Sequence, residues 1–308
     1  MDEHTPVLVD ESLAALGAEA DGFYVDATFG RGGHTARLLE ALGGEGRVLA
    51  LDRDARAIEA GRQRFPHEVR LTLLHAAFAD LATLVPAQSH GRACRGVLFD
   101  LGVSSPQLDD PARGFSFRAE GPLDMRMDAT RGEPVSAWLA RAGLDEIREV
   151  IATLGEERFA RRVAEAIVNS RAQRAITTTS QLADIVSRAV RTREPGKHPA
   201  TRTFQALRMF INDELGQLER GLAGAADVLA VGGRLVVITF HSLEDRVVKL
   251  FMQRESRVAP ELARLPTIPP SAQPRFKIVG RKMRPGDAER ARNPRSRSAL
   301  LRVAERVR

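Results

Sequence analysis

Short apolar runs alternate with helical patterns up to residue 105 of the chain. The run Phe23–Val25 precedes a helix-like repeat of apolar residues over Thr35–Leu42. Later strand-like runs cover Val48–Leu51, Val69–Leu74 and Val97–Phe99, and a second helical pattern covers Ala55–Phe65. Because strands that alternate with helices build parallel sheets, this part predicts an α/β fold with a parallel sheet.

The pattern becomes helical in the middle of the chain. Residues 106–134 are rich in Pro, Gly, Asp and Arg and predict an ordered loop. Apolar residues then recur at helical spacing in the segments Ala137–Ala142, Leu144–Leu154, Glu156–Arg171 and Thr179–Arg191. Thr179, Ser180 or both are expected to cap the last of these helices. The pattern predicts an all-helical domain, inserted at residues 108–210.

Sheet character returns towards the C-terminus. An amphipathic helix is expected over Asn212–Val231, ended by Gly232 and Gly233. The β-branched run Arg234–Phe240 is typical of a buried parallel strand. Arg275–Val279 and Ala299–Ala304 are the expected final strands, and residues 259–274, with five prolines, an expected loop. Residues 1–107 and 211–308 therefore form one discontinuous sheet domain.

A glycine-rich turn follows the first predicted strand. Gly30, Gly32 and Gly33 lie just before the helix that begins at Thr35. Glycine permits positive φ and close approach of a ligand, and such a turn at the end of a first strand is a nucleotide site in α/β sheets. The dinucleotide fingerprint fails, because its sixth position is occupied by Thr35.

Carboxylates stand at or just beyond the ends of the predicted strands, at Asp26, Asp52, Asp80 and Asp100. Asp52 follows Gly30 by 22 residues and could accept both hydroxyls of a ribose. Each Asp alone is equally well explained as a cap or turn residue. Together they form an acidic rim that suits a cationic ligand such as S-adenosylmethionine better than a pyrophosphate.

Composition narrows the class of protein. The chain is 43% apolar, and no apolar run approaches the length of a membrane span. Met1–Glu11 lacks the basic and apolar regions of a signal peptide. Cys94 is the only cysteine, which excludes an intrachain disulfide and a cysteine-based zinc site. These features predict a soluble, cytoplasmic protein that makes no use of a membrane.

Positive charge is concentrated at the C-terminal end. Residues 254–308 contain 15 Lys and Arg against 5 Asp and Glu, a net charge of +10, whereas the whole chain carries +6. A basic loop is also expected at 188–208, with Arg188, Arg191, Arg193, Lys197, His198, Arg202 and Arg208. Such asymmetry favours a nucleic-acid partner over a merely solvated surface.

Two polar segments follow predicted strands and are candidates for catalysis. Ser104, Ser105, Pro106 and Gln107 come after Asp100, where amino methyltransferases place a short polar motif ending in Pro; a plain turn is the alternative. His241 opens a polar cluster after Arg234–Phe240 and is either a site residue or a helix-start residue. No GxSxG elbow supports a hydrolase, and no histidine spacing supports a metal site.

Taken in order, these motifs closely resemble the bacterial ribosomal small-subunit methyltransferase H family, also called MraW. The resemblance runs from His4–Leu8 to Asn293–Ser298. The motifs that carry it are Gly30–His34, Leu51–Asp54, Asp100–Asp109, Arg113–Phe117, Gly121–Asp128, Gly155–Phe159, Lys197–Ala206 and Phe240–Arg246.

The resemblance implies a class I S-adenosylmethionine-dependent methyltransferase fold, Rossmann-like, with an inserted helical domain that recognises substrate. It implies methyl transfer to the N4 amine of one cytosine in the decoding region of 16S rRNA. Cofactor contacts are implied for Gly32, Gly33, His34, Asp52, Phe78, Asp100 and Gln107, to which the turn adds Gly30.

The catalytic set expected from these considerations is Asp100, Ser104, Ser105, Pro106 and His241, with no metal. The expected partner is 16S rRNA, within the small ribosomal subunit, and a homodimer is left open. A non-catalytic rRNA-binding assembly factor is the main alternative, and a nicotinamide-dependent dehydrogenase is disfavoured by the missing third glycine.

Overall fold

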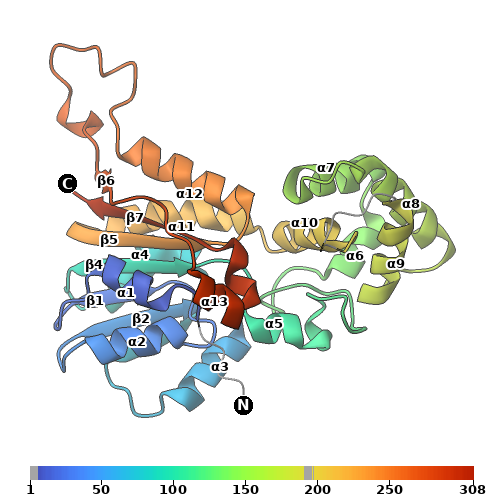
Figure 1. Cartoon of the computed structure of the whole chain (residues 1–308), viewed down its shortest axis with the longest axis horizontal. Helices are drawn as coiled ribbons and strands as arrows, with labels where there is room; N and C mark the ends of the chain where they lie inside the picture. Colours follow the sequence, from blue (N-terminus) through green and yellow to red (C-terminus); the bar gives the residue numbers. More distant parts are fainter. Residues whose placement is uncertain (1–5, 191–195, 197) are drawn as a thin grey trace. The chain divides into compact units, whose positions relative to one another are not determined.

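The chain folds as two units. The computed structural model describes residues 6–190, 196 and 198–308. Residues 1–102 and 215–308 form the sheet unit, and residues 103–214 form the helical unit (Figure 1). The sheet unit is thus made from two separate stretches of sequence.

A seven-stranded sheet organises the sheet unit. Its strands have the order β3-β2-β1-β4-β5-β7-β6. Strands β1 to β5 pair in parallel, whereas β7 runs antiparallel to β5 and β6. The bounds are β1 Phe23–Asp26, β2 Arg47–Asp52, β3 Leu71–His75, β4 Cys94–Asp100, β5 Leu229–Thr239, β6 Phe276–Ile278 and β7 Leu300–Arg306. The predicted α/β class is confirmed, and the strand order reverses between β1 and β4, where open α/β sheets bind ligands.

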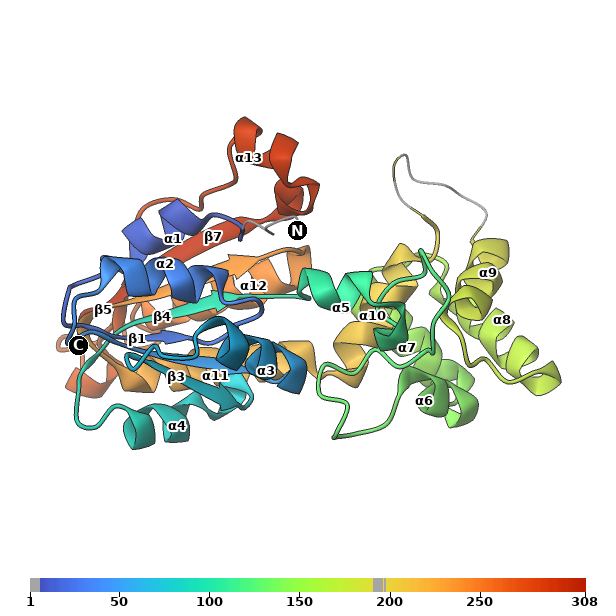
Figure 2. The same cartoon turned by 90° about the horizontal axis from the view of Figure 1, so that it is seen from below.

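Helices cover both faces of this sheet (Figures 1 and 2). One face packs against α1 Val9–Leu16, α2 Gly33–Ala41 and α3 Ala55–Arg64, and the other against α4 Leu81–Gln88, α11 Glu214–Val228 and α12 Ser242–Glu255. Successive strand residues point to opposite faces, so Val48 and Ala50 join the first core while Leu49 and Leu51 join the second. The last helix of the unit is α13 Asp287–Arg292, and short 3₁₀ helices cover Phe78–Asp80, Pro270–Ala272 and Pro294–Ser298.

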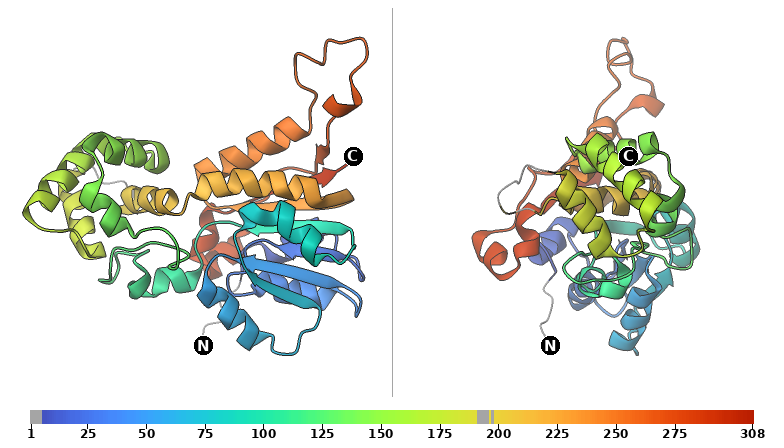
Figure 3. Two further views of the ribbon diagram at one scale, coloured as in Figure 1. Left: turned by 180° about the vertical axis from the view of Figure 1, so that it is seen from behind. Right: turned by 90° about the vertical axis from the view of Figure 1, so that its right-hand side faces the viewer.

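The helical unit has its own core around Trp138, whose indole N–H donates to Glu146 at 3.0 Å. Figure 3 shows its helices in green and yellow. They are α5 Ser105–Asp109, α6 Val135–Arg141, α7 Leu144–Gly155, α8 Ala160–Gln173, α9 Thr179–Ala189 and α10 Thr201–Ile211, with a 3₁₀ turn at Pro111–Arg113. Each apolar stripe of these helices therefore finds its partners inside the unit.

Side chains fix the segment that the sequence predicts as an ordered loop. Asn212 donates to the carbonyl of Met125 at 2.7 Å and accepts from the N–H of Met127 at 2.8 Å. Met125 itself has φ +63°, a backbone conformation that residues other than glycine rarely adopt. Arg113 donates to the carbonyls of Arg126 and Met127. The Asn212 clamp thus compensates local backbone strain.

Several element boundaries differ from the sequence expectations. Thr178, not Thr179 or Ser180, caps α9, because its extended backbone lets Oγ1 accept from Gln181. Strand β5 begins at Leu229, inside the expected helix, because Leu229 pairs with Cys94 of β4. Strand β3 begins only at Leu71, and Val69 before it is largely exposed.

The expected basic loop at 188–208 is wrong at both ends. Helix α9 runs to Ala189 and includes Arg188, and helix α10 begins at Thr201, so Arg202 and Arg208 are helical too. Arg208 binds the carboxylate of Glu214 with two hydrogen bonds of 2.7 Å, which commits its charge within the helical unit. Arg191, Arg193 and Lys197 lie outside the described residues, as do His4 and Thr5.

Candidate functional site

The glycine turn lies at the carboxyl end of β1 and leads directly into α2. Gly30 and Gly32 have φ of +54° and +70°, so the turn requires residues without a side chain. A Cβ on Gly33 would lie 2.1 Å from the ring of Pro6, which packs against the turn. The backbone N–H of Gly30 donates to Asp52 at 2.8 Å. The turn and the end of β2 are therefore tied together.

Asp52 is the last residue of β2 and accepts one N–H on each oxygen. Besides Gly30, the N–H of Asp54 donates to its second oxygen at 2.8 Å. Burial raises the pKa of Asp52 to about 6, and the charges of Asp54 and Asp26 act in the same direction. Since a carboxylate oxygen has two lone pairs, each oxygen can accept one further hydroxyl donor, as a ribose would supply.

Asp26 has a structural role. Its buried carboxylate accepts from the Thr35 hydroxyl at 2.6 Å and from the N–H of Thr28 at 3.2 Å, which fixes the start of α2 to the end of β1. Asp26, Asp52 and Asp100 end their strands, whereas Asp80 lies in a 3₁₀ helix beyond β3. The acidic rim therefore has three members at strand ends.

Asp100 ends β4 beside the glycine turn, because its backbone N–H donates to the Thr28 hydroxyl at 2.6 Å. Its Oδ2 lies 3.7 Å from Nδ1 of His34. Its Oδ1 is buried and has no hydrogen-bond partner. The pKa of Asp100 is raised to about 6, chiefly by burial; the nearby His34 acts to lower it, and the negative charges of Asp26 and Glu244 act to raise it. A buried acceptor without a donor is costly, which makes Oδ1 a candidate contact for a ligand.

Phe78 lies after β3 and packs edge-on against Phe99 of β4, with ring centroids 5.4 Å apart. Its ring also lies against α11, where a Cβ on Gly221 would come within 2.6 Å of it. The contact between Phe78 and Gly221 was not predicted from the sequence, because the two residues are far apart along the chain.

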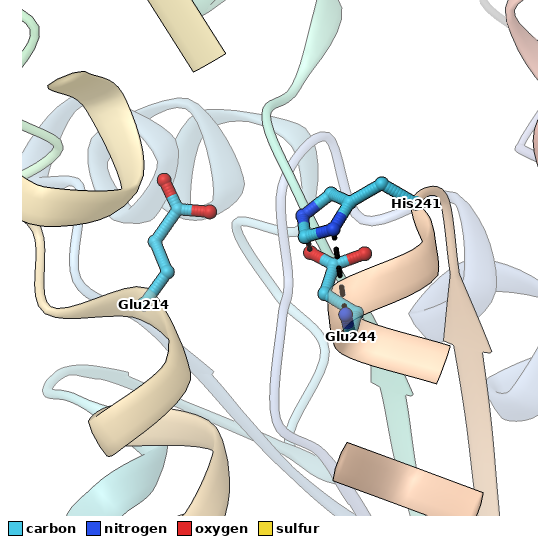
Figure 4. A group of neighbouring side chains, drawn as sticks. All are labelled: Glu214, His241 and Glu244. Carbon is cyan, nitrogen blue, oxygen red and sulfur yellow. Dashed lines mark hydrogen bonds and ion pairs between the residues drawn. The ribbon is translucent and has the colours of Figure 1, made fainter. Parts of the chain in front are cut away.

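His241 caps the start of α12 (Figure 4). Its Nδ1 accepts from the N–H of Glu244 at 3.4 Å, and its Nε2 lies 3.0 Å from a Glu244 oxygen. The other Glu244 oxygen accepts from the N–H of Phe240 at 2.9 Å. Glu214, also drawn in Figure 4, is the last residue of the helical unit and is held there by Arg208. His241 thus has a defined helix-capping role, and its catalytic role stays a prediction.

The predicted motif Ser104–Gln107 belongs to the helical unit and begins α5. Ser104 is the N-cap, and its backbone N–H donates to the Gln107 side chain at 2.9 Å in a capping box. Ser105 and Gln107 are buried. Pro106 occupies the first turn, where its missing N–H leaves no bond unmade. Roles of these residues towards cofactor or substrate remain predictions.

The similarity to known proteins extends over essentially the whole chain. The sequence profile of the MraW methylase family matches residues 1–307. Ribosomal RNA small subunit methyltransferase H of Azoarcus sp. is 54% identical over 308 residues, covering 99% of this chain and 97% of the relative. The protein of the same name from Burkholderia mallei is 52% identical over 310 residues, covering 99% and 98%.

Solved structures with a similar course of the chain include a putative rRNA-methylase from Clostridium thermocellum. It has a TM-score of 0.47 and 13% identity, and the match covers 98% of each chain. Among the described residues, no helix combines the length and apolar character needed to cross a membrane.

Proposed function

The chain belongs to the MraW methylase family, and from this premise we propose that it transfers a methyl group from S-adenosylmethionine to the N4 amine of a cytosine in 16S rRNA. The observation that carries the proposal is the buried, unpartnered Oδ1 of Asp100. It lies at the point of strand-order reversal, where open α/β sheets bind ligands, beside the glycine turn.

The described residues fit the cofactor. The Gly30–Gly33 turn gives backbone access, and Asp52 keeps one acceptor position on each oxygen for the ribose hydroxyls. Phe78, steadied by Phe99 and Gly221, offers an aromatic surface next to β3 for the adenine. We assign Gly30, Gly32, Gly33, His34, Asp52, Phe78, Asp100 and Gln107 to this site. When bound, the cofactor supplies a methyl group activated by a sulfonium.

Asp100 and the residues that follow it are proposed to handle the amine. The lone pair of cytosine N4 is delocalised into the ring, so alignment of this nitrogen contributes much of the catalysis. Asp100 accepts an N4 proton as the N–C bond forms. Ser104 follows Asp100 by four residues, so their Cα atoms are at most about 14 Å apart. Ser104, Ser105 and Pro106 orient the base, and His241 completes the set.

RNA binding is proposed to use the helical insert and the basic C-terminal region. The net charge of +10 over residues 254–308 suits a phosphate backbone, while base contacts specify the nucleotide. We assign substrate recognition to residues 108–210. The target cytosine must leave its stack to reach a buried carboxylate, as base-modifying enzymes require. No metal is needed for this chemistry.

The setting of the reaction is proposed from its substrate. Names of the relatives specify the RNA of the small ribosomal subunit, so we place the protein in the cytoplasm and infer that it acts on the assembled subunit. Whether the protein forms a homodimer can be tested directly by sedimentation.

Methylation of 16S rRNA from a strain that lacks the enzyme tests the proposed function. Small subunits and free rRNA are incubated separately with the protein and methyl-labelled S-adenosylmethionine, and nucleosides are identified by mass spectrometry. We expect N4-methylcytidine at one position, with faster labelling of subunits. Label on a ring carbon, or none on either substrate, would contradict the proposal.

Asp52 variants separate the cofactor site from the rest. Asp52→Ala removes the ribose acceptor and should weaken S-adenosylhomocysteine binding by about 1–3 kcal/mol, as read by calorimetry. Asp21→Asn, an exposed change in the same unit, is the matched control. Unchanged affinity in Asp52→Ala would overturn the assignment of the ribose contact.

A further inference from the structure

Both ring nitrogens of His34 face protein acceptors. Its Nε2 lies 3.1 Å from the carbonyl oxygen of Val7, and its Nδ1 lies 3.7 Å from Oδ2 of Asp100. The ring is almost fully buried, with 7% of the side chain exposed. Any contact between His34 and the cofactor is therefore made by the His34 backbone at the start of α2, and the imidazole serves a different role.

The Val7 contact determines where one proton lies. A carbonyl oxygen only accepts, so Nε2 must carry a hydrogen. Nδ1 then holds either a lone pair or a second hydrogen. A lone pair facing a carboxylate is repulsive, whereas a hydrogen there creates an attraction between imidazolium and carboxylate. At 3.7 Å the two groups are too far apart for a hydrogen bond, so a charged imidazole acts on the Asp100 carboxylate through space.

The negative charges around Asp100 explain why its carboxylate form needs the positive charge of His34. Asp26 of β1 and Glu244 of α12 both act on Asp100 with negative charge, while His34 of α2 acts in the opposite direction. Without an opposing positive charge, burial among carboxylates would favour the neutral acid. Only the carboxylate of Asp100 can take up a proton at the vacant acceptor position of Oδ1.

We propose that His34 is a positioning residue for the methyl transfer: held by the Val7 carbonyl, its imidazole keeps Asp100 ionised and turned so that Oδ1 faces the target amine. This inference rests on the proposed function for the identity of the amine. The pairing of His34 with Asp100 can be tested without that function.

The transfer balances with these groups. The N4 lone pair forms the new N–C bond, and the C–S bond breaks with its electron pair left on sulfur as a neutral thioether. The excess proton on N4 passes to Oδ1 of Asp100, giving a neutral carboxylic acid and a neutral methylated amine. When the products leave, Asp100 returns the proton to water, and His34 restores the carboxylate.

Carboxyl NMR of the ligand-free protein tests the pairing. Aspartate is labelled at its carboxyl carbon, and the Asp100 signal is assigned by its loss in Asp100→Asn. His34→Gln keeps an amide N–H for the Val7 carbonyl but cannot carry positive charge, and exposed His67→Gln is the matched control. We expect the Asp100 midpoint to rise by about one pH unit in His34→Gln and to stay unchanged in His67→Gln. An unchanged midpoint in a folded His34→Gln protein would overturn the pairing.

Single-turnover kinetics between pH 5 and 9 test the role in transfer. The wild-type rate should rise with pH through the Asp100 midpoint, and in His34→Gln this rise should move upward by the same interval. The variant is then about tenfold slower on the acid side but close to wild type on the alkaline plateau. A uniform loss at every pH would assign His34 a purely structural role. Absence of N4 methylation by the wild-type protein would defeat the proposed function, while the NMR result would still decide the pairing.

Discussion

At the scale of single residues, Asp100 shows a conflict between stability and chemistry. Its Oδ1 is buried without a donor, and Asp26 and Glu244 surround it with negative charge. The folded protein therefore holds a carboxylate where a neutral group would be more stable, a pattern common at functional sites.

Asp100→Asn should stabilise the protein in a pH-dependent way. The folded pKa of about 6 lies above the ordinary 3.8, so the folded state binds the proton more tightly and the wild type loses stability as pH rises from 4 to 6. With a quarter of the side chain exposed, we expect a gain of about 1–2 kcal/mol at pH 8 and little at pH 4. Urea denaturation at both pH values measures it. Equal gains at both would indicate a packing effect.

Residues of the site could be predicted from sequence where they depend on local pattern. Asp52 and the Gly30–Gly33 turn were found because each follows an apolar strand directly. The contacts of His34 with Val7, and of Asp100 with Thr28, join segments that periodicity does not relate. The sequence therefore identified Asp100 and His34, but not the pairing between them.

At the scale of elements, α11 positions Phe78 through a missing side chain. Gly221→Ala would put a Cβ within 2.6 Å of the Phe78 ring. We expect a loss of about 1–3 kcal/mol in unfolding free energy from overpacking, together with weaker S-adenosylhomocysteine binding as the ring moves. Gly286→Ala, which meets no atom within 4 Å, is the control. Stabilisation in Gly221→Ala would mean that the ring yields without cost.

The Asn212 clamp makes an equally local prediction for the helical unit. Asn212→Ala removes the acceptor for the Met127 N–H and the donor to Met125. The cost should be about 1–3 kcal/mol for the unsatisfied buried groups, measured by thermal denaturation. Asn212→Asp keeps the acceptor but places a buried carboxylate oxygen against the carbonyls of Met125 and Arg208, so it should lose more. A smaller loss in Asn212→Asp than in Asn212→Ala would show that the acceptor for the Met127 N–H carries the clamp.

The observed strands match those predicted from the apolar pattern where they are buried on both faces, as in β2 and β4. The start of β5 was misplaced because Leu229 fits a helix stripe equally well, and its pairing with Cys94 decided the outcome. The start of helix α12 was left open, because the residues from His241 onward fitted a polar site and a helix start equally well, and the structure shows His241 as the helix cap. Backbone pairing and capping, which depend on distant partners, override local pattern at such places.

At the scale of the whole molecule, division into two units makes function separable. Replacing residues 108–210 with a short Gly/Ser linker should leave a sheet unit that binds S-adenosylhomocysteine, because its cofactor residues other than Gln107 lie at or before Asp100. Methylation of small subunits should be lost. Calorimetry and nucleoside analysis measure the two outcomes. Methylation at a normal rate would remove the recognition role from the insert.

The order of the strands also has a consequence for synthesis on the ribosome. Strand β4 lies inside the finished sheet, but its neighbour β5 is encoded after the entire helical unit. At ordinary elongation rates, roughly 6–26 s pass between the two strands. During this interval the edge of β4 that later pairs with β5 is apolar and unpaired. Such an edge binds chaperones and promotes aggregation. Because of the insertion, each newly made chain is prone to aggregation during this interval, which a continuous sheet domain would largely avoid.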